Sequence, residues 1–210
     1  MDNSQKITSK EQLRALYSAP MPMAVKKQQD SLDTYAKQFL QLCPFITLST
    51  VGQSGFLDCS PRGDHPGFIQ SIGNQSIAIP DRPGNNRLDS LTNIVECSEV
   101  GVLALIPGFK ECLRINGEAY IDVTPGLLKR FEYRNKLPTS VIVVNVREVY
   151  FHCAKAITRS HLWDSESYVD RSEMPSFGRI LMEQIKGDVS DEDVEKAETL
   201  IAERVKTTLY

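Results

Sequence analysis

The chain has 210 residues, of which 41% are hydrophobic and 24% are charged, and its formal net charge is −3. A chain of this length buries roughly 70% of the surface that it exposes when unfolded, so one domain with appendages is expected. The slightly acidic balance argues against nucleic acid or an anionic membrane as the main partner. No apolar run approaches the roughly 20 residues of a membrane span.

The first residues and the cysteines indicate the compartment. Met1–Lys6 contains no apolar segment, so export is not expected. Five cysteines are widely spaced and include no C-x-x-C pair, which is typical of reduced thiols and predicts a cytoplasmic protein. The three histidines show no spacing known from metal-ligand sets, so no metal site is predicted.

Residues 1–44 are predicted to form a helical segment that packs on the rest of the domain. A short helix ends near Tyr17, before two prolines, and a longer helix carries apolar residues at helical spacing up to Pro44. The candidate caps are Thr8 or Ser9 for the first helix and Asp30 or Ser31 for the second.

From residue 45 onward the hydrophobic period changes from helical to alternating, with glycine-containing turns between the runs. A short helix is expected over residues 125–131, before the longest run. About six antiparallel strands with hairpin spacing, interrupted by one helix, predict a mainly β, α+β fold: a closed or partly closed β-barrel. The runs that read as strands are 45–51, 56–60, 67–72, 76–79, 100–106, 112–123 and 140–153.

The composition changes again after Trp163. Pro175 at the first helical position and Gly187 are predicted to bracket one helix, and Ser190 to cap a last helix that ends near Lys206. Both helices carry an apolar stripe, and the sequence leaves open whether they pack on the barrel or on a partner subunit. The expected organisation is one domain in three parts: a helical segment at 1–44, a barrel at 45–164 and a helical extension at 165–210.

The stretch Ile79–Val95 reads as the end of a strand, a rigid turn and a capped helix. Pro83-Gly84 suits the centre of a type II turn, in which glycine takes a positive φ. Asn86 is the predicted N-cap, and Asp89 completes a capping-box-like pair. The predicted apolar face of the helix consists of Leu88, Leu91 and Val95.

Arg87 is the unusual residue of this stretch. It is predicted to lie in the first helical turn, at the positive end of the macrodipole, where a cation is unfavourable. The position makes sense if an anion binds there, because free N–H groups, the dipole and a guanidinium then converge on it. Arg82 would add a second positive group. The alternative is a surface turn with two solvated arginines.

Ser60–Asp64 is a second candidate, because it ends a predicted strand and Gly63 would let the backbone approach a ligand closely. A strand-end loop with an internal pair of Arg62 and Asp64 explains the same residues equally well. The sequence contains no G-x-G-x-x-G after a strand, no P-loop and no G-x-S-x-G elbow, so dinucleotide, P-loop and hydrolase sites are not predicted. No catalytic residue is identified.

Two further stretches carry polar residues in regular patterns. Alternation along the strand at 112–123 places Arg114, Asn116 and Glu118 on one face. A solvated face is favoured for Glu118, and the role of Asn116 stays open. Lys155 and Arg159 are four residues apart and would face the same way on a helical turn. Either an anionic ligand or two solvated side chains would explain this pair.

Four of these stretches, in order and with compatible spacing, resemble the pyridoxamine 5′-phosphate oxidase-related, FMN-binding split-barrel family. More narrowly, they resemble a bacterial subgroup of FMN-dependent enzymes. The resemblance covers about residues 40–164, and Asp81–Arg87 is its most specific part. The stretches are Ser60–Asp64, Ile79–Ser90, Asn116–Gly117 and Phe151–Ala156.

The resemblance implies a six-stranded antiparallel split barrel and a homodimer with FMN at the subunit interface. In that fold a strand-end arginine and the loop before a helix hold the flavin phosphate. Here these are Arg62 and the loop Pro80–Arg87, with Arg87 as the strongest phosphate ligand. The anion inferred from charge placement would be the FMN phosphate. The candidate cofactor-binding residues are Ser60, Arg62, Gly63, Asp64, Pro80, Asp81, Arg82, Asn85, Asn86, Arg87, Asn116, Lys155 and Arg159.

The expected function is that of a flavin-dependent oxidoreductase acting on an unidentified small molecule, with the hydride or electron chemistry supplied by the cofactor. Lys155 or Arg159 near the flavin could stabilise the anion formed on reduction. True pyridoxine-phosphate oxidases end on a barrel strand with an arginine-rich C-terminus, whereas this chain continues through two helices, so vitamin B6 synthesis is not expected.

The alternatives are a non-catalytic flavin- or haem-binding split barrel and an F420-dependent enzyme on the same fold. A barrel that binds single-stranded nucleic acid is the weakest alternative, because aromatic residues make up only 8% of the chain.

Overall fold

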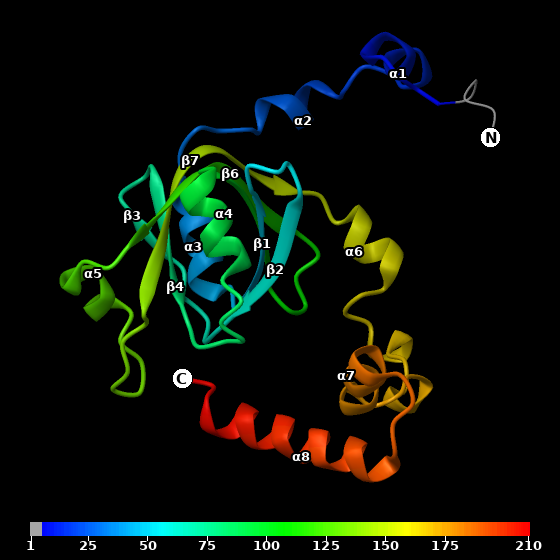
Figure 1. Cartoon of the computed structure of the whole chain (residues 1–210). Coiled ribbons are helices and arrows are strands. Elements are labelled where there is room, and N and C mark those ends of the chain that lie inside the picture. Colours follow the sequence, from blue (N-terminus) through cyan, green and yellow to red (C-terminus); the bar gives the residue numbers. More distant parts are fainter. Residues whose placement is uncertain (1–5) are drawn as a thin grey trace.

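The structure is a computed structural model that describes residues 6–210, so the first five residues of the predicted segment 1–44 lie outside the described residues. At its centre is one antiparallel sheet of seven strands in the order β2-β1-β5-β6-β7-β4-β3, curled into a barrel (Figure 1). The strands are β1 (Phe45–Val51), β2 (Leu57–Gly63), β3 (Gln70–Ile72), β4 (Ser76–Asp81), β5 (Glu99–Leu105), β6 (Cys112–Asp122) and β7 (Ser140–His152). The predicted α+β class and antiparallel split barrel are confirmed. Each of the seven runs that read as strands contributes one strand, so the sheet has seven strands and not the six that the resemblance implies; the short β3, from the run 67–72, pairs with β4 at one edge.

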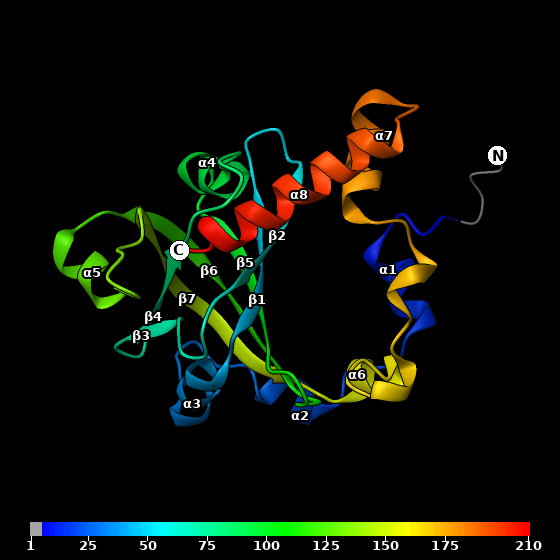
Figure 2. The same ribbon diagram turned by 90° about the horizontal axis from the view of Figure 1, so that it is seen from below.

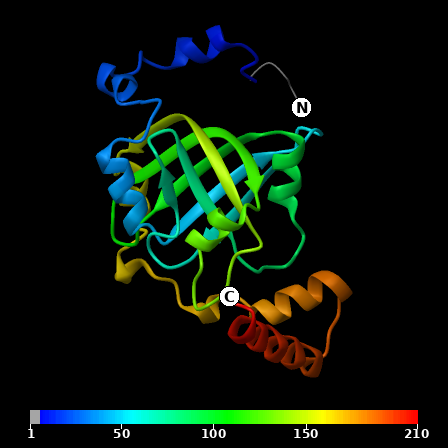
Figure 3. The same cartoon turned by 90° about the vertical axis from the view of Figure 1, so that its left-hand side faces the viewer.

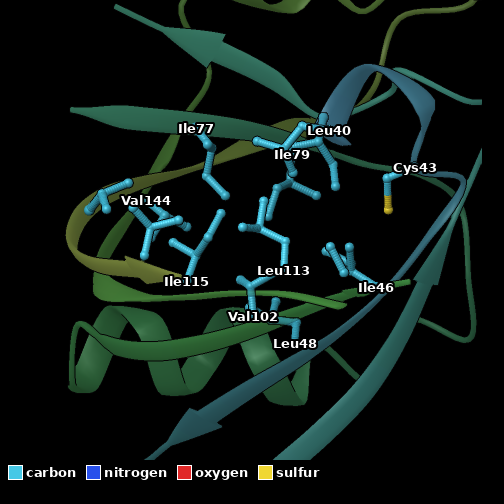
Figure 4. Packing of buried hydrophobic residues seen from close by; sticks show 14 of the residues in the cluster. Leu40, Cys43, Ile46, Leu48, Ile77, Ile79, Val102, Leu113, Ile115 and Val144 are labelled. Atoms are coloured by element: carbon cyan, nitrogen blue, oxygen red, sulfur yellow. The ribbon is translucent and has the colours of Figure 1, made fainter. Parts of the chain in front are cut away.

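The interior of the barrel forms because apolar residues alternate along the strands. In β1, Ile46 and Leu48 are fully buried between more exposed neighbours, and Leu113 and Ile115 occupy the same place in β6. They meet apolar side chains from the other strands inside the barrel (Figure 4). Burial of apolar surface stabilises a fold by roughly 25 cal/mol per Å², so this interior is the main source of stability.

Three helices pack against the sheet, two on its interior side and one on the outer face of β4 and β7. The helix α3 (Thr34–Leu42) adds Phe39 and Leu40 to the interior. The helix α4 (Asp89–Glu96) packs on β1, β2 and β6, and α5 (Pro125–Arg130) lies beside a small second cluster on β4 and β7. The prediction that Asp30 or Ser31 caps α3 is wrong. Asp33 is the cap, since its carboxylate accepts the Ala36 N–H at 2.7 Å.

The N-terminal residues extend away from the barrel (Figures 1 and 3). The helix α1 (Lys10–Leu16) is capped by Ser9, which is one of the two predicted candidates. It is followed by the helix α2 (Pro22–Lys26), which was not predicted. Neither α1 nor α2 contains a buried residue. Among the described helices of the predicted segment, only α3 contributes to the core, together with Leu32 before it and Cys43 after it.

The C-terminal residues also leave the barrel. After α6 (Lys155–Ser160), the helices α7 (Phe177–Lys186) and α8 (Asp191–Thr207) pack on each other as a helical hairpin (Figure 2). Ser190 caps α8 as predicted. The expectation that α7 starts at Pro175 is wrong, because Ser176 is the N-cap and accepts the Arg179 N–H. Among the described residues, no helix is both long and apolar enough to span a membrane.

Candidate functional site

Two ion pairs join strands that are far apart in the sheet order. Arg62, near the end of β2, donates from Nη1 to Asp81 Oδ1 at 2.5 Å, and Arg82, after β4, donates from Nε to Asp64 Oδ2 at 2.6 Å. Four strands separate β2 from β4 in the sheet, so these contacts form only because the sheet curls until its two sides meet. The alternative interpretation of this stretch, a local pair of Arg62 with Asp64, is therefore wrong. The two pairs are crossed between the strand ends.

Asp64 is the most enclosed of these charged groups, with only 1% of its side chain exposed. Burial alone would raise its pKa. The hydrogen bonds that it accepts from Arg82, from the backbone and ring of His65, and from the Tyr210 hydroxyl outweigh burial and lower the pKa below the usual aspartate value. Asp64 is thus held ionised, and it fixes the position of Arg82.

We expect Asp64→Asn to destabilise the fold by about 1–3 kcal/mol at neutral pH, because a buried guanidinium loses its charged partner. A carboxyl with a lowered folded-state pKa contributes stability that is present above its unfolded pKa and is lost as the pH falls through the folded pKa. The wild-type melting temperature should therefore fall below about pH 4, and the difference from Asp64→Asn should shrink there. Thermal melts between pH 3 and pH 7 check this; a difference that stays constant with pH would contradict it.

The loop between β4 and α4 differs from its prediction. Gly84 does not take a positive φ, so Pro83-Gly84 is not the predicted type II turn; Asn86 and Leu88 take the left-handed conformation instead. Asn85 Oδ1 accepts the Arg87 N–H at 3.0 Å, a turn that asparagine side chains favour. The helix starts only at Asp89, after Leu88 as its N-cap residue. Asn86 is therefore not the N-cap.

Two consequences follow for the helix and for Arg87. The face of α4 that packs inward consists of Ser90, Leu91 and Ile94, and both Leu88 and Val95 are exposed, contrary to prediction. Arg87 precedes the helix and so does not lie in its first turn.

The Arg87 side chain is 72% exposed and donates from Nε to Asp89 at 2.8 Å. This arginine is available to a ligand, but its charge is already paired with a carboxylate.

A chain of hydroxyl groups ties β2 to the start of α4. Ser90, which is buried, donates to Asp58 at 2.6 Å, and its Oγ lies 3.0 Å from Ser60 Oγ. Because Ser90 is the second residue of α4, this network fixes the start of the helix against the strand. Ser60 is thereby held in position beside Arg62, two residues further along β2.

These groups surround one cavity of about 530 Å³, which is within the range of small-molecule sites. All but three of the predicted cofactor-binding residues line it. They are Ser60, Arg62, Gly63, Asp64, Pro80, Asp81, Arg82, Asn85, Asn86 and Arg87. Other lining residues include the apolar Phe68, Leu88 and Leu91.

The structure places the other three predicted residues elsewhere. Asn116 lies in the middle of β6 and donates to Glu148. Lys155 and Arg159 belong to α6, which follows the last residue of β7, whereas the first residue of β7, Ser140, lines the cavity. A 13-residue strand spans about 40 Å, so the cavity is beyond the reach of both cations within one chain.

The arginines that line the cavity are held by aspartates but keep N–H groups from which an anion could accept hydrogen bonds. Its lining contains three arginines, each paired with an aspartate, and one further aspartate, Asp58. Among the described residues, Arg62 uses only Nη1 and Arg82 only Nε in hydrogen bonds, so their other N–H groups are available. The carboxylates orient the guanidinium groups, and a phosphate can accept hydrogen bonds from the groups that remain.

The sequence reasoning missed Asp58, Ser90 and Tyr210. Asp58 could have been found from the alternation that places it on the same side of β2 as Ser60 and Arg62. Tyr210 had no local signal, because it lies 146 residues from Asp64. Burial and the contact with Asp64 raise the pKa of the Tyr210 phenol, which keeps it protonated as the donor in that bond.

The curled antiparallel sheet defines a split-barrel protein, and the cavity between its strand ends is lined by three arginines. The chain belongs to the pyridoxamine 5′-phosphate oxidase family, whose model matches residues 32–153, more than half of its length. A search of the curated proteins finds no match.

Several solved structures are similar to this chain. HupZ from Group A Streptococcus is 12% identical, with a TM-score of 0.46, over 56% of this chain and 91% of its own. An FMN-binding protein from Syntrophomonas wolfei is 17% identical, with a TM-score of 0.40, over 50% of this chain and 75% of its own. A protein named F420 reductase is 16% identical, with a TM-score of 0.39, over 55% of this chain and 94% of its own.

Proposed function

We propose that this protein binds FMN, with the phosphate held in the cavity between β2, β4 and the start of α4. The observation that carries the proposal is the pair of crossed ion pairs, Arg62 with Asp81 and Arg82 with Asp64, which hold two guanidinium groups at the lining of one cavity. Arg87 supplies a third, solvent-accessible cation at the mouth. Membership of the family supports FMN as the anion.

The proposed activity is that of a flavin-dependent oxidoreductase acting on a small molecule. When bound, FMN would supply the hydride or electron transfer, and the chain would bind and orient it. Arg62 and Arg82 would hold the phosphate, while Ser60 and the turn at Asn85 and Asn86 would shape the site around it. In these roles the residues bind and position the cofactor, and none of them transfers a proton.

The proposed assembly is a homodimer with FMN at the subunit interface. Most residues that line the cavity are polar or charged, and the large apolar side chains among them, Phe68, Leu88 and Leu91, are few for a ring as large as isoalloxazine. A second copy could cover the ring, and only a second copy could bring Lys155 or Arg159 near it. Light scattering should give a dimer mass for the FMN-bound protein at micromolar concentration; a monomer mass with FMN still bound would contradict the dimer.

A comparison of FMN with riboflavin tests the phosphate site directly, because the two molecules differ only in the phosphate. We expect FMN to bind at least about a hundredfold more tightly, since charge-assisted hydrogen bonds contribute roughly 1.5–3 kcal/mol each. Equilibrium dialysis with each flavin measures the ratio. Equal affinities would contradict the proposed site. A Soret band, or preference for F420 over FMN, would support the haem or deazaflavin alternatives.

A further inference from the structure

Two segments of the chain expose apolar side chains that find no cover in the chain itself. The arm, residues 6–27, contains α1 and α2; the hairpin consists of α7 and α8 with the residues that join them. On α1, Leu13 and Leu16 recur at helical spacing, followed by Tyr17, and their exposed fractions range from 44% to 67%. The other exposed apolar residues of the two segments are Ile7, Met21, Met23, Val25, Phe177, Ile185, Leu200 and Val205.

The arm needs a packing surface to be helical. Its two helices have seven and five residues and contain no buried residue. Isolated helices shorter than roughly 12–15 residues are marginal in water, because nucleation is unfavourable. The cap at Ser9 helps α1 only modestly. The helical arm therefore indicates a partner surface that its own barrel does not supply.

The hairpin exposes apolar side chains that could provide the packing surface that the arm needs. The helices α7 and α8 approach closely on one side, where a Cβ added at Gly178 would lie 2.4 Å from the Glu198 side chain. On their other sides, Phe177 and Ile185 of α7 and Leu200 of α8 remain mostly exposed. These side chains are available to a partner, because no other part of the described chain covers them.

The charges of the two segments are complementary. Residues 6–27 contain five basic residues and one acidic residue, whereas the hairpin, residues 177–207, contains eight acidic and five basic residues. Lys10 and Arg14, one turn apart on α1, form no ion pair with any described carboxylate. Glu195 and Glu203 on α8 likewise have no ion-pair partner among the described residues. Opposite charges beside exposed apolar residues favour association and fix its orientation.

The arm and the hairpin of one chain are held apart. In Figures 1 and 3, α1 lies above the barrel and α8 below it. The hairpin is fixed to its own barrel by Tyr210, whose hydroxyl donates to Asp64 and whose carbonyl oxygen accepts from Lys136. Trp163 fixes the start of the extension, since its Nε1 donates to the Phe109 carbonyl oxygen at 2.7 Å. The surface that covers the arm therefore belongs to another molecule.

We propose that the arm of each copy packs on the hairpin of a second copy of this chain, which gives two equivalent contacts in a twofold dimer. The inference rests on the proposed dimer and deepens it by naming the segments that join the subunits. Leu13, Leu16 and Tyr17 would pack on the exposed apolar residues of the hairpin. Lys10 and Arg14 would lie near the acidic residues of α8.

Two charge-reversed variants test the inference when they are combined. One carries Lys10→Glu and Arg14→Glu in the arm, and the other carries Glu195→Lys and Glu203→Lys in the hairpin. Each variant alone places like charges at both contacts of its homodimer. In a heterodimer of the two, one contact has both partners reversed and the other has neither, so both contacts regain opposite charges. The heterodimer is obtained by co-expression with two different affinity tags.

The measurement is amide hydrogen exchange of α1 in the full-length proteins. We expect protection of α1 in the wild type, a loss of about tenfold in each variant alone, and recovery in the heterodimer, because two exposed ion pairs turn repulsive in each contact. The control variant Lys110→Glu with Arg130→Glu has the same charge change at exposed sites outside both segments, and it should keep wild-type protection.

Three results would overturn the inference. The wild-type α1 could exchange as fast as an unfolded chain. The heterodimer could fail to recover. Protection of α1 could be restored in a variant with all four substitutions in one chain but not in the heterodimer, which would indicate that the arm contacts the hairpin of its own chain. FMN affinity and dimer mass, measured on the same samples, separate these results from failure of the proposed function. If the heterodimer keeps its dimer mass and FMN affinity but α1 does not regain protection, only the proposed contact between arm and hairpin is rejected.

Discussion

Replacement of Arg87 by alanine is expected to weaken FMN binding by roughly two to four orders of magnitude while leaving the barrel folded. Arg87 is mostly exposed and lies in the loop, between the left-handed residues Asn86 and Leu88, so it contributes little to packing. Its only ion pair, with Asp89, is exposed, and such pairs are worth about 0.2–1 kcal/mol. With FMN bound, loss of two charge-assisted hydrogen bonds to the phosphate would remove about 3–6 kcal/mol.

Melting with and without FMN, together with an FMN titration, measures both parts of this prediction. Arg87→Lys should fall between wild type and alanine, because an ammonium group lacks the bidentate fork of a guanidinium. Arg130→Ala is the matched control, since Arg130 is exposed and does not line the cavity. If Arg87→Ala keeps wild-type affinity, Arg87 is a solvated surface residue, and Arg62 and Arg82 alone would have to hold the phosphate.

Most of the barrel could be predicted from the sequence because its strands carry a local signal. Along β1, buried residues alternate with more exposed ones over Phe45–Val51, the range predicted from the hydrophobic period. The caps at Ser9 and Ser190 were also accessible, since a cap bonds to a backbone N–H only three residues away. The Asp33 cap was missed because several cap-forming residues lie close together before α3.

The arrangement of the site could be predicted only in part. Most of the residues that line the cavity come from two stretches that the sequence singled out, and both begin at strand ends. Their pairing could not be predicted, because Arg62 meets Asp81 and Asp64 meets Arg82 only after the sheet curls. The loop was misjudged for a local reason: the left-handed residues are Asn86 and Leu88, whereas glycine was the expected one.

Gly117 offers a test of the barrel itself, and its replacement by alanine is expected to have the largest effect on stability. Gly117 lies on β6, at a register shift in the pairing with β7. A Cβ added there would lie 2.0 Å from the carbonyl oxygen of Asn145, a distance that real Cβ atoms do not reach. The neighbouring atom belongs to the backbone of the longest strand, so relief would require β6 and β7 to move apart.

We expect Gly117→Ala to destabilise the fold by at least about 4 kcal/mol, the range in which a single substitution disrupts a core element. For a domain of this size, that corresponds to a fall in melting temperature of about 8–16 °C. Gly126→Ala is the matched control: Gly126 lies in α5 with open space around it, and alanine there should be neutral or stabilise by up to about 1 kcal/mol. Urea unfolding of both variants decides the matter. If the free energy of unfolding of Gly117→Ala lies within about 1 kcal/mol of the wild-type value, the prediction is wrong. Strands β6 and β7 would then separate easily at the register shift beside Asn116, and this part of the barrel would be less rigid than the strand pairing indicates.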